Sequence, residues 1–192
     1  MRLIKTQLFS IASLLLVVSA PAQTSDTKHF TKDGLTFDYS NGWTINDESN
    51  SDAQLLTLSR NDSDAQIKLF VHRGKVNTPE KMAEAKRQLI DPYVEHTNKQ
   101  FVEMGAKPER APASTEIGGA PAEGIRIQAV LDEPGEAAIY WIALGNRVVV
   151  LAFSGPSKAL KKATPTWDMI RNSIKIVPPL ESQPSPKPSP KP

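Results

Sequence analysis

The sequence predicts an α+β domain in which strands join through tight turns and helices cover the resulting sheet. Runs of alternating apolar and polar residues flank turn signals such as Asn41-Gly42, which is typical of antiparallel hairpins. Thr78-Pro79 opens a stretch whose apolar residues recur at helical spacing. The runs 137–144 and 148–153 are apolar on both faces, so the sheet needs cover from helices.

The segment 34–45 (GLTFDYSNGWTI) predicts a strand, a tight turn and a second strand. Its first half has the period-2 pattern of a strand with one buried face, carried by Leu35, Phe37 and Tyr39. Asn41-Gly42 is a strong hairpin signal because both residues tolerate positive φ. Trp43 and Ile45 restart the alternation, so we expect the strand before this turn to pair with the strand that starts at Trp43.

Residues 53–59 and 65–72 predict a second hairpin around the polar turn 60–64. In its second strand, one face carries Ile67, Leu69 and Val71, and the other carries Lys68, Phe70 and His72. Residues 28–31 predict a short edge strand before the Lys32-Asp33-Gly34 turn, and the polar run 46–52 predicts a loop.

The main helix is predicted to begin at Thr78, a good N-cap, with Pro79 as its first helical residue, and to end at Gly105. One apolar stripe runs along it, formed by Met82, Ala85, Leu89, Tyr93, Phe101 and Met104. Pro92 lies inside this pattern. Because proline removes a backbone hydrogen bond and clashes with the preceding turn, we expect a kink or a break near Asp91.

The second half of the chain predicts an edge strand near 114–117, a Gly118-Gly119 turn, and strands at 122–131, 137–144 and 148–154. Gly145-Asn146 is predicted as a two-residue hairpin loop. Ser157 predicts the cap of a short helix, Thr164-Pro165 predicts the start of another that runs to Ser173, and residues 174–177 predict a last strand.

The two ends of the chain are predicted to lie outside this single domain of residues 28–177. Residues 1–22 have the pattern of a secretory signal peptide: basic Arg2 and Lys5, an apolar run 8–18, and small residues at 20–22. That run is too short to span a bilayer comfortably, so we expect cleavage and no permanent membrane anchor. Residues 178–192 are proline-rich and predict a disordered tail of polyproline II character.

Charge and cysteine content exclude several classes of protein. The net charge is +2, and Arg2 and Lys5 account for all of it, which leaves 21 basic and 21 acidic side chains after the predicted cleavage. A formally neutral chain without a basic cluster does not indicate nucleic-acid binding. The absence of cysteine excludes disulfides, thiolate metal sites and the lipid anchor of a bacterial lipoprotein.

The two ends of the predicted domain resemble the PsbP-like and DcrB-like family of exported domains. The matching residues are Gly34, Phe37, Tyr39, Gly42 and Trp43 at the start, and Ile170, Ser173, Ile174 and Lys175 at the end. This chain departs from the pattern at Ser40, where proline is usual, and at Ile174, where phenylalanine is usual. The resemblance spans residues 30–177 and implies an α/β/α sandwich, a mainly antiparallel sheet flanked by helices on both faces. It implies no catalytic residues.

The residues indicate no catalytic, cofactor-binding or metal-binding site. His29, His72 and His96 lie in three different predicted elements, without the spacing of a metal motif. Ser154 and Ser157 flank Gly155-Pro156, which is not a nucleophile elbow. The acidic loop 47–52 lacks the ligand pattern of a calcium loop. No glycine-rich stretch fits a phosphate-binding loop.

Trp43, Trp141 and Trp167 are predicted as core residues, with a pocket between sheet and helix as the alternative. The sequence thus favours a non-enzymatic accessory or binding domain, exported to the periplasm or the exterior of a bacterium, whose partner is an unknown protein or small ligand of the cell envelope. Two alternatives stay open. One is an envelope hydrolase that uses a histidine, and the other is a cell-wall-associated structural protein that uses the Lys-Pro tail.

Overall fold

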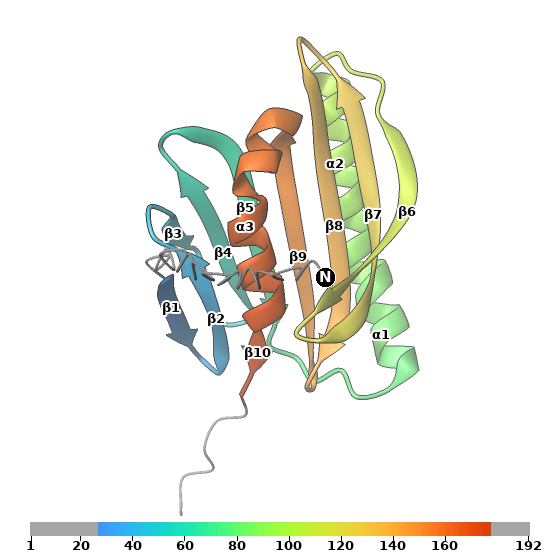
Figure 1. The fold of residues 1–192 in the computed structure, drawn as a ribbon. Helices are drawn as coiled ribbons and strands as arrows, with labels where there is room; N and C mark the ends of the chain where they lie inside the picture. Colours follow the sequence, from blue (N-terminus) through green and yellow to red (C-terminus); the bar gives the residue numbers. More distant parts are fainter. Residues whose placement is uncertain (1–26, 178–192) are drawn as a thin grey trace, which may run out of the picture.

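The computed structural model describes residues 27–177 and arranges their strands in two antiparallel sheets (Figure 1). The predicted signal segment 1–22 and the predicted tail 178–192 lie outside the described residues. The smaller sheet has the order β1–β2–β10, formed by Thr27–Lys32, Leu35–Ser40 and Lys175–Ile176. The seven-stranded sheet has the order β3–β4–β5–β9–β8–β7–β6, formed by Thr44–Asp47, Ala53–Arg60, Ser63–His72, Arg147–Pro156, Pro134–Leu144, Ala120–Val130 and Glu109–Ile117.

Helices lie on both faces of the larger sheet, so the predicted fold class is confirmed. Helix α3 (Ser157–Ser173) crosses one face, in front of β9 in the view of Figure 1. The opposite face carries α1 (Pro79–Ala85), the π-helical turn η1 (Lys86–Ile90) and α2 (Asp91–Glu103), which lies behind β7 and β8 in Figure 1. The antiparallel hairpins β4–β5, β6–β7 and β8–β9 are those expected from the sequence.

The face under α3 holds the larger hydrophobic core. Helix α3 shares this face with the three-stranded sheet, which contributes the fully buried Leu35 and Phe37. Trp167 of α3 stacks on Phe153 of β9 with ring centroids 5.0 Å apart. The second core lies under the other helices and is formed mainly by β7, β8 and β9, with members Ile127, Ala137, Ile139, Trp141, Val148, Val150 and Ala152. Each face of the sheet thus has its own core.

The predicted pairing across Asn41-Gly42 is wrong. Strand β2 belongs to the small sheet and β3 to the large one, so this turn carries the chain from one sheet to the other. Trp43, directly after the turn, is only 2% exposed, and burying it in the core fixes the chain's path more strongly than the local turn preference does. The hairpin forms one turn earlier, at Asp33-Gly34, where Lys32 pairs with Leu35. Both turn residues have positive φ, as a type I′ turn requires.

The long helix begins as the sequence predicts. The Thr78 side chain accepts a hydrogen bond from the Lys81 amide at 3.3 Å, and Gly105 follows the helix end. The helix is irregular near Asp91, as expected from Pro92, and the irregularity is a π-helical turn. The Asp91 amide bonds to the carbonyl of Lys86, five residues back, so the turn before Pro92 widens into a π-helix and the chain stays helical.

The end of the domain differs from the prediction of two helices. Residues 157–173 form one helix with Pro165 inside it, and Ser157 is its first residue, after Pro156 at the N-cap. Pro165 is exposed, so the carbonyl that it leaves without a partner in the helix faces solvent, at low cost. The buried stripe on the other side of the helix holds it together across this point, with Leu160, Ala163, Trp167 and Ile170.

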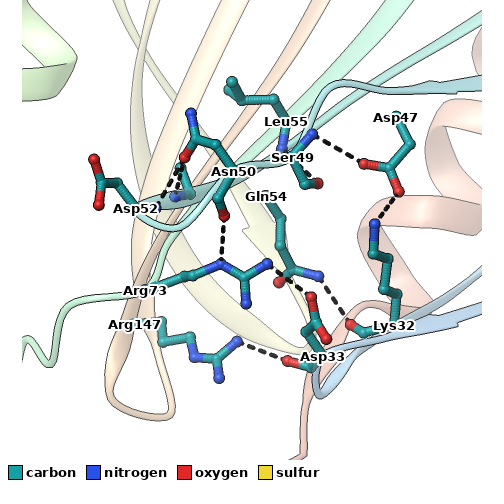
Figure 2. Close-up of polar contacts among 11 residues, drawn as sticks. Lys32, Asp33, Asp47, Ser49, Asn50, Asp52, Gln54, Leu55, Arg73 and Arg147 are labelled. Carbon is teal, nitrogen blue, oxygen red and sulfur yellow. Dashed lines mark hydrogen bonds and ion pairs between the residues drawn. The ribbon is translucent and has the colours of Figure 1, made fainter.

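Polar contacts fasten the tip of the β1–β2 hairpin to the large sheet (Figure 2). Arg73, after β5, donates to the Asp33 carboxylate at 2.7 Å and to the Asn50 carbonyl at 3.0 Å, and Arg147 donates to the Asp33 carbonyl at 2.9 Å. Gln54 is fully buried beneath them and donates to the Lys32 carbonyl at 2.8 Å. Arg73 and the Asp33 carboxylate form an ion pair, and together with the hydrogen bonds of Arg147 and Gln54 it joins the two sheets.

Candidate ligand-binding cavity

A cavity lies on the sheet face that carries the long helix, over β4, β5 and β9. Its floor consists of side chains from neighbouring strands that lie opposite one another in register. Leu55 pairs with Phe70, and Phe70 pairs with Val150, which forms one row. In the next row Lys68 pairs with Thr57 on one side and with Ala152 on the other. Lys68 and Phe70 lie on the same face of β5 because side chains alternate between the two faces of a strand. That face forms the floor of the cavity.

The π-helical turn forms the wall of the cavity. Gln88 and Leu89 of η1 and Tyr93 of α2 line it. In the same turn, the Lys86 ammonium lies 5.5 Å from the ring centre of Trp141 and covers the indole, so Trp141 belongs to the core beside the cavity. A π turn displaces side chains relative to a regular α-helix, and such turns occur often at functional sites. Here it sets which residues face the sheet.

The cavity measures about 330 Å³ and is lined mainly by apolar atoms. The lining residues with polar side chains are Lys68, Tyr93, Thr57, Gln88 and Glu48, of which Lys68, Gln88 and Glu48 are exposed. Burial raises the pKa of Tyr93 above its ordinary value, because loss of water disfavours the phenolate. Tyr93 therefore stays protonated and keeps its O–H as a donor. Within residues 27–177, Lys68 makes no ion pair.

A wider groove of about 770 Å³ adjoins the cavity at Lys68, which lines both. It extends along α2 toward the β7–β8 turn, past Phe101 and Met104. Acidic side chains border it: Asp64, Glu103, Asp132 and Glu133. The large apolar side chains Met104 and Leu131, 57% and 41% exposed, also lie along it. Lys68 is the basic residue among those that line this groove.

The structure keeps the three histidines apart. His29, on β1, contacts the Asp38 carboxylate at 2.6 Å, whereas His72 ends β5 and His96 is exposed on α2. Among residues 27–177, no three His, Asp or Glu side chains group as a metal site would require. Ser154 pairs with Gln66, six residues along β5 from His72, which is roughly 20 Å at the rise of a strand. These pairings therefore keep Ser154 away from His72.

The acidic loop uses its oxygens internally. Asp47 accepts hydrogen bonds from Lys32 at 2.6 Å and from the Ser49 amide at 3.0 Å (Figure 2). The Lys32 contact, followed by those of Ser49, lowers the pKa of Asp47 to about 2. The Asn50 side chain accepts from the amides of Asp52 and Ala53. These contacts close the loop between β3 and β4, and they account for its polar composition.

The three tryptophans are buried, as predicted for core residues, with exposures of 2%, 6% and 7% for Trp43, Trp141 and Trp167. Trp167 also borders a polar hollow of about 340 Å³ beside α3. Two ion pairs lie around that hollow, Arg126 with Glu136 at 3.0 Å and Arg171 with Asp168 at 2.8 Å, and the exposed Lys161 also borders it. The pocket between sheet and helix thus exists, but Leu55, Phe70 and Tyr93 line it in place of the tryptophans.

Fold and cavity together define a layered α+β domain with a largely apolar pocket. The comparisons with solved structures concern this fold. Cyanobacterial PsbP from Synechocystis sp. PCC 6803 matches with a TM-score of 0.48 and 9% identity, over 82% of this chain and 96% of that protein. A protein from Bacteroides thetaiotaomicron VPI-5482 matches with a TM-score of 0.50 and 12% identity, over 78% of this chain. This chain spans 48% of the Bacteroides protein.

An immunity protein of the Pseudomonas aeruginosa type VI secretion system, TplEi, matches with a TM-score of 0.40 and 16% identity, over 83% of this chain and 57% of that protein. No protein-family model matches the chain, and no curated protein matches it by sequence. Cyanobacterial PsbP, among these matches, belongs to the group that the two ends of the domain resemble. At these identities the likeness describes a fold and assigns no activity.

No helix within residues 27–177 is long and apolar enough to cross a membrane. The sequence suggested a pocket between sheet and helix as an alternative, but it did not indicate which residues line the cavity. Its floor residues carry a signal in hindsight: Phe70 is a large apolar side chain on the polar face of β5, between Lys68 and His72. Such a residue on an otherwise polar face indicates that something apolar lies above it.

Proposed function

We propose that this protein is an exported, non-enzymatic binding domain, and that the cavity between the sheet and the π-helical turn is where its ligand binds. One observation carries the proposal: a mainly apolar cavity of about 330 Å³ with a few polar groups on its lining. This size and composition are typical of small-molecule sites, which occupy roughly 300–1,000 Å³. The partner expected from the sequence, a protein or a small ligand of the envelope, is thereby narrowed to a small ligand.

The lining residues support binding more than catalysis. No histidine or serine is among the residues that line the cavity, and its ionisable groups are Lys68, Tyr93 and Glu48. Nucleophilic catalysis needs a nucleophile within hydrogen-bond reach of a base. In the described part of the chain, no hydrogen bond or ion pair joins any two of these three side chains. The floor lies on paired strands, which favours a preformed pocket over one that must assemble on binding.

The export part of the proposal rests on residues 1–22. When the full chain is expressed in a bacterium, the protein recovered outside the cytoplasm is expected to begin at Gln23, after Ala22. N-terminal sequencing checks this. Recovery of the chain in the cytoplasm with Met1 or Arg2 at its start would refute export and would leave the cavity proposal standing.

The cavity part is tested by filling the cavity. Thr57 lies on the floor and is half-buried, so Thr57→Phe adds a ring to the cavity on a strand that favours aromatic residues. Thr31→Phe, on the exposed edge strand β1, is the matched control. In NMR titrations of the purified protein with neutral 1-octanol, we expect saturable shifts of the Leu55, Phe70 and Ala152 amides.

Thr57→Phe should raise the apparent Kd for 1-octanol at least tenfold, whereas Thr31→Phe should leave this Kd unchanged. Saturable shifts that centre on another surface, or that survive Thr57→Phe in a folded protein, would show that the cavity is not the binding site.

A further inference from the structure

We infer that the cavity selects amphipathic monoanions, molecules with an apolar body and one carboxylate that binds Lys68. The inference rests on the proposed function, because it concerns the ligand class of the same cavity. It follows from three features of the lining: an exposed lysine without an ion pair among the described residues, beside a mainly apolar wall, neutral side chains with O–H groups in the same lining, and carboxylates around the perimeter.

Lys68 is placed as an anchor for an anion. Its Cα lies in the middle of the floor, because β5 has β4 on one side and β9 on the other. The ion pairs found within residues 27–177 use other lysines and arginines, among them Lys32, Lys86 and Arg73. Lysine side chains commonly lay their methylene stem along apolar surface and keep the charged end polar. Phe70 and Ala152 supply such surface beside Lys68.

The neutral groups of the cavity complete a site for a carboxylate. Tyr93 and Thr57 both line it and both carry an O–H. A carboxylate accepts hydrogen bonds and donates none, so O–H donors and an ammonium suit it. Hydrogen bonds to an ionised group are also roughly twice as strong as those between neutral groups. Leu55, Leu89 and Val150 then remain to receive the apolar body of the ligand.

The perimeter limits the ligand to a single negative charge. Glu48 lies at the rim of the cavity, on the side of β3 and β4. Beyond Lys68, the adjoining groove carries Asp64, Glu103, Asp132 and Glu133. An anion with a second charged group, such as a dicarboxylate or a phosphate monoester, would bring that charge toward one of these carboxylates. Like charges placed close together oppose binding and give selectivity.

The test compares three probes with the same eight-carbon chain and different ends: octanoate, 1-octanol and octylammonium. Each is titrated into the full protein at pH 7 and followed by the amide shifts of the floor residues. We expect octanoate to bind about tenfold more tightly than 1-octanol, and octylammonium to bind most weakly. In Lys68→Met, which keeps the stem, octanoate should lose this advantage while 1-octanol is unchanged.

Two further variants separate charge from folding. Lys68→Arg keeps a cation and should retain most of the preference for octanoate. Lys158→Met removes an exposed lysine of α3, on the opposite face of the sheet, and should change nothing. Suberate, a dicarboxylate with eight carbons, should bind at least tenfold more weakly than octanoate.

The outcomes distinguish the inference from the proposed function. If 1-octanol and octanoate bind the cavity equally, or if the octanoate preference persists in Lys68→Met, the cavity binds ligands but Lys68 does not select them, and the inference is overturned. Tightest binding of octylammonium would also overturn it and would assign the selection to Glu48. If none of the probes shifts the floor residues, the proposed function fails as well.

Discussion

Substitution of Gly34 tests the contact between the beginning and the end of the domain. Gly34 has a φ of +80°, and a Cβ placed there would lie 2.3 Å from the Val177 carbonyl oxygen, which is a backbone atom. The Val177 amide donates to the Gly34 carbonyl at 2.7 Å, next to the β2–β10 pairing. In Gly34→Ala the strand end must therefore move away, and this hydrogen bond must lengthen or break.

Three contributions set the size of the effect. Left-handed backbone costs a residue with a Cβ about 1–2 kcal/mol. Losing a backbone hydrogen bond costs about 0.5–1.5 kcal/mol, and displaced packing adds to both. We expect Gly34→Ala to lower the free energy of unfolding by about 2–4 kcal/mol, which is a large part of the stability of a typical domain.

Gly42→Ala is the matched control. Gly42 has a similar φ of +84°, but a Cβ there has no neighbour within 4 Å. This variant should show the backbone term alone, about 1–2 kcal/mol. Urea unfolding followed by the fluorescence of the three tryptophans measures both variants. If the two substitutions cost the same to within about 0.5 kcal/mol, the close approach of Gly34 and Val177 does not contribute to stability, and the reasoning is refuted.

Two further predictions concern the joint between the sheets. The pKa of Asp47 is lowered to about 2, so this carboxylate stabilises the fold above its ordinary pKa of 3.8 and the contribution is lost as the pH falls from about 5 to 2. In urea unfolding, Asp47→Asn should lower the free energy of unfolding by up to about 1 kcal/mol at pH 7 and by progressively less toward pH 2. A loss of stability that does not change with pH would contradict its origin in the ion pair with Lys32. Gln54 is fully buried and donates a hydrogen bond to the Lys32 carbonyl. Gln54→Glu places a carboxylate oxygen against this carbonyl oxygen and buries a negative charge. At pH 7 the substitution should lower the free energy of unfolding by about 3 kcal/mol. Burial raises the pKa of the new carboxyl in the folded state, and the protonated carboxyl can again donate to the Lys32 carbonyl. The stability of the variant should therefore recover as the pH falls toward 4. An equal loss of stability at pH 4 and pH 7 would show that the cause is the shape of the side chain and not its charge.

The parts of the fold that follow from local pattern could be predicted from the sequence. The faces of β5, the Thr78 cap and the hairpin at Gly145-Asn146 each depend on residues close together in the chain, and the structure confirms them. The disturbance before Pro92 also follows from one residue. Its form as a π-helical turn does not, because a kink, a break and a π turn all relieve the same missing hydrogen bond.

The errors arose where tertiary burial overrode a local signal. Asn41-Gly42 has the preferred residues of a hairpin turn, but Trp43 is buried between elements that the local sequence does not identify, and the chain changes sheets there. Thr164-Pro165 has the pattern of a helix start. The helix nevertheless continues through it because Leu160 and Trp167, on either side, are buried in the same core. In both cases the deciding interaction involves residues far away in the sequence.

The residues that carried the family resemblance turn out to meet in space. Phe37 lies in β2 and Gly34 directly precedes it. Ile174 directly precedes β10, and Lys175 in β10 pairs with Thr36 of β2. The Ser173 hydroxyl also accepts a hydrogen bond from the Asp38 amide at 2.8 Å. The opening and closing segments are therefore the two halves of one structural joint. This explains why they carry information about the fold and none about chemistry.

The location of the cavity follows from the widths of the layers. Seven strands about 4.8 Å apart span roughly 29 Å, whereas one helix with its side chains is about 10–12 Å wide. On one face, α3 and the three-stranded sheet lie side by side and together cover the strands. On the other face, α2 lies over the half formed by β7, β8 and β9, and the apolar side chains of β4 and β5 meet only its edge. The helical segments α1, η1 and α2 do not cover so wide a sheet, so Leu55 and Phe70 remain half-buried, and the cavity proposed as the ligand site lies over them.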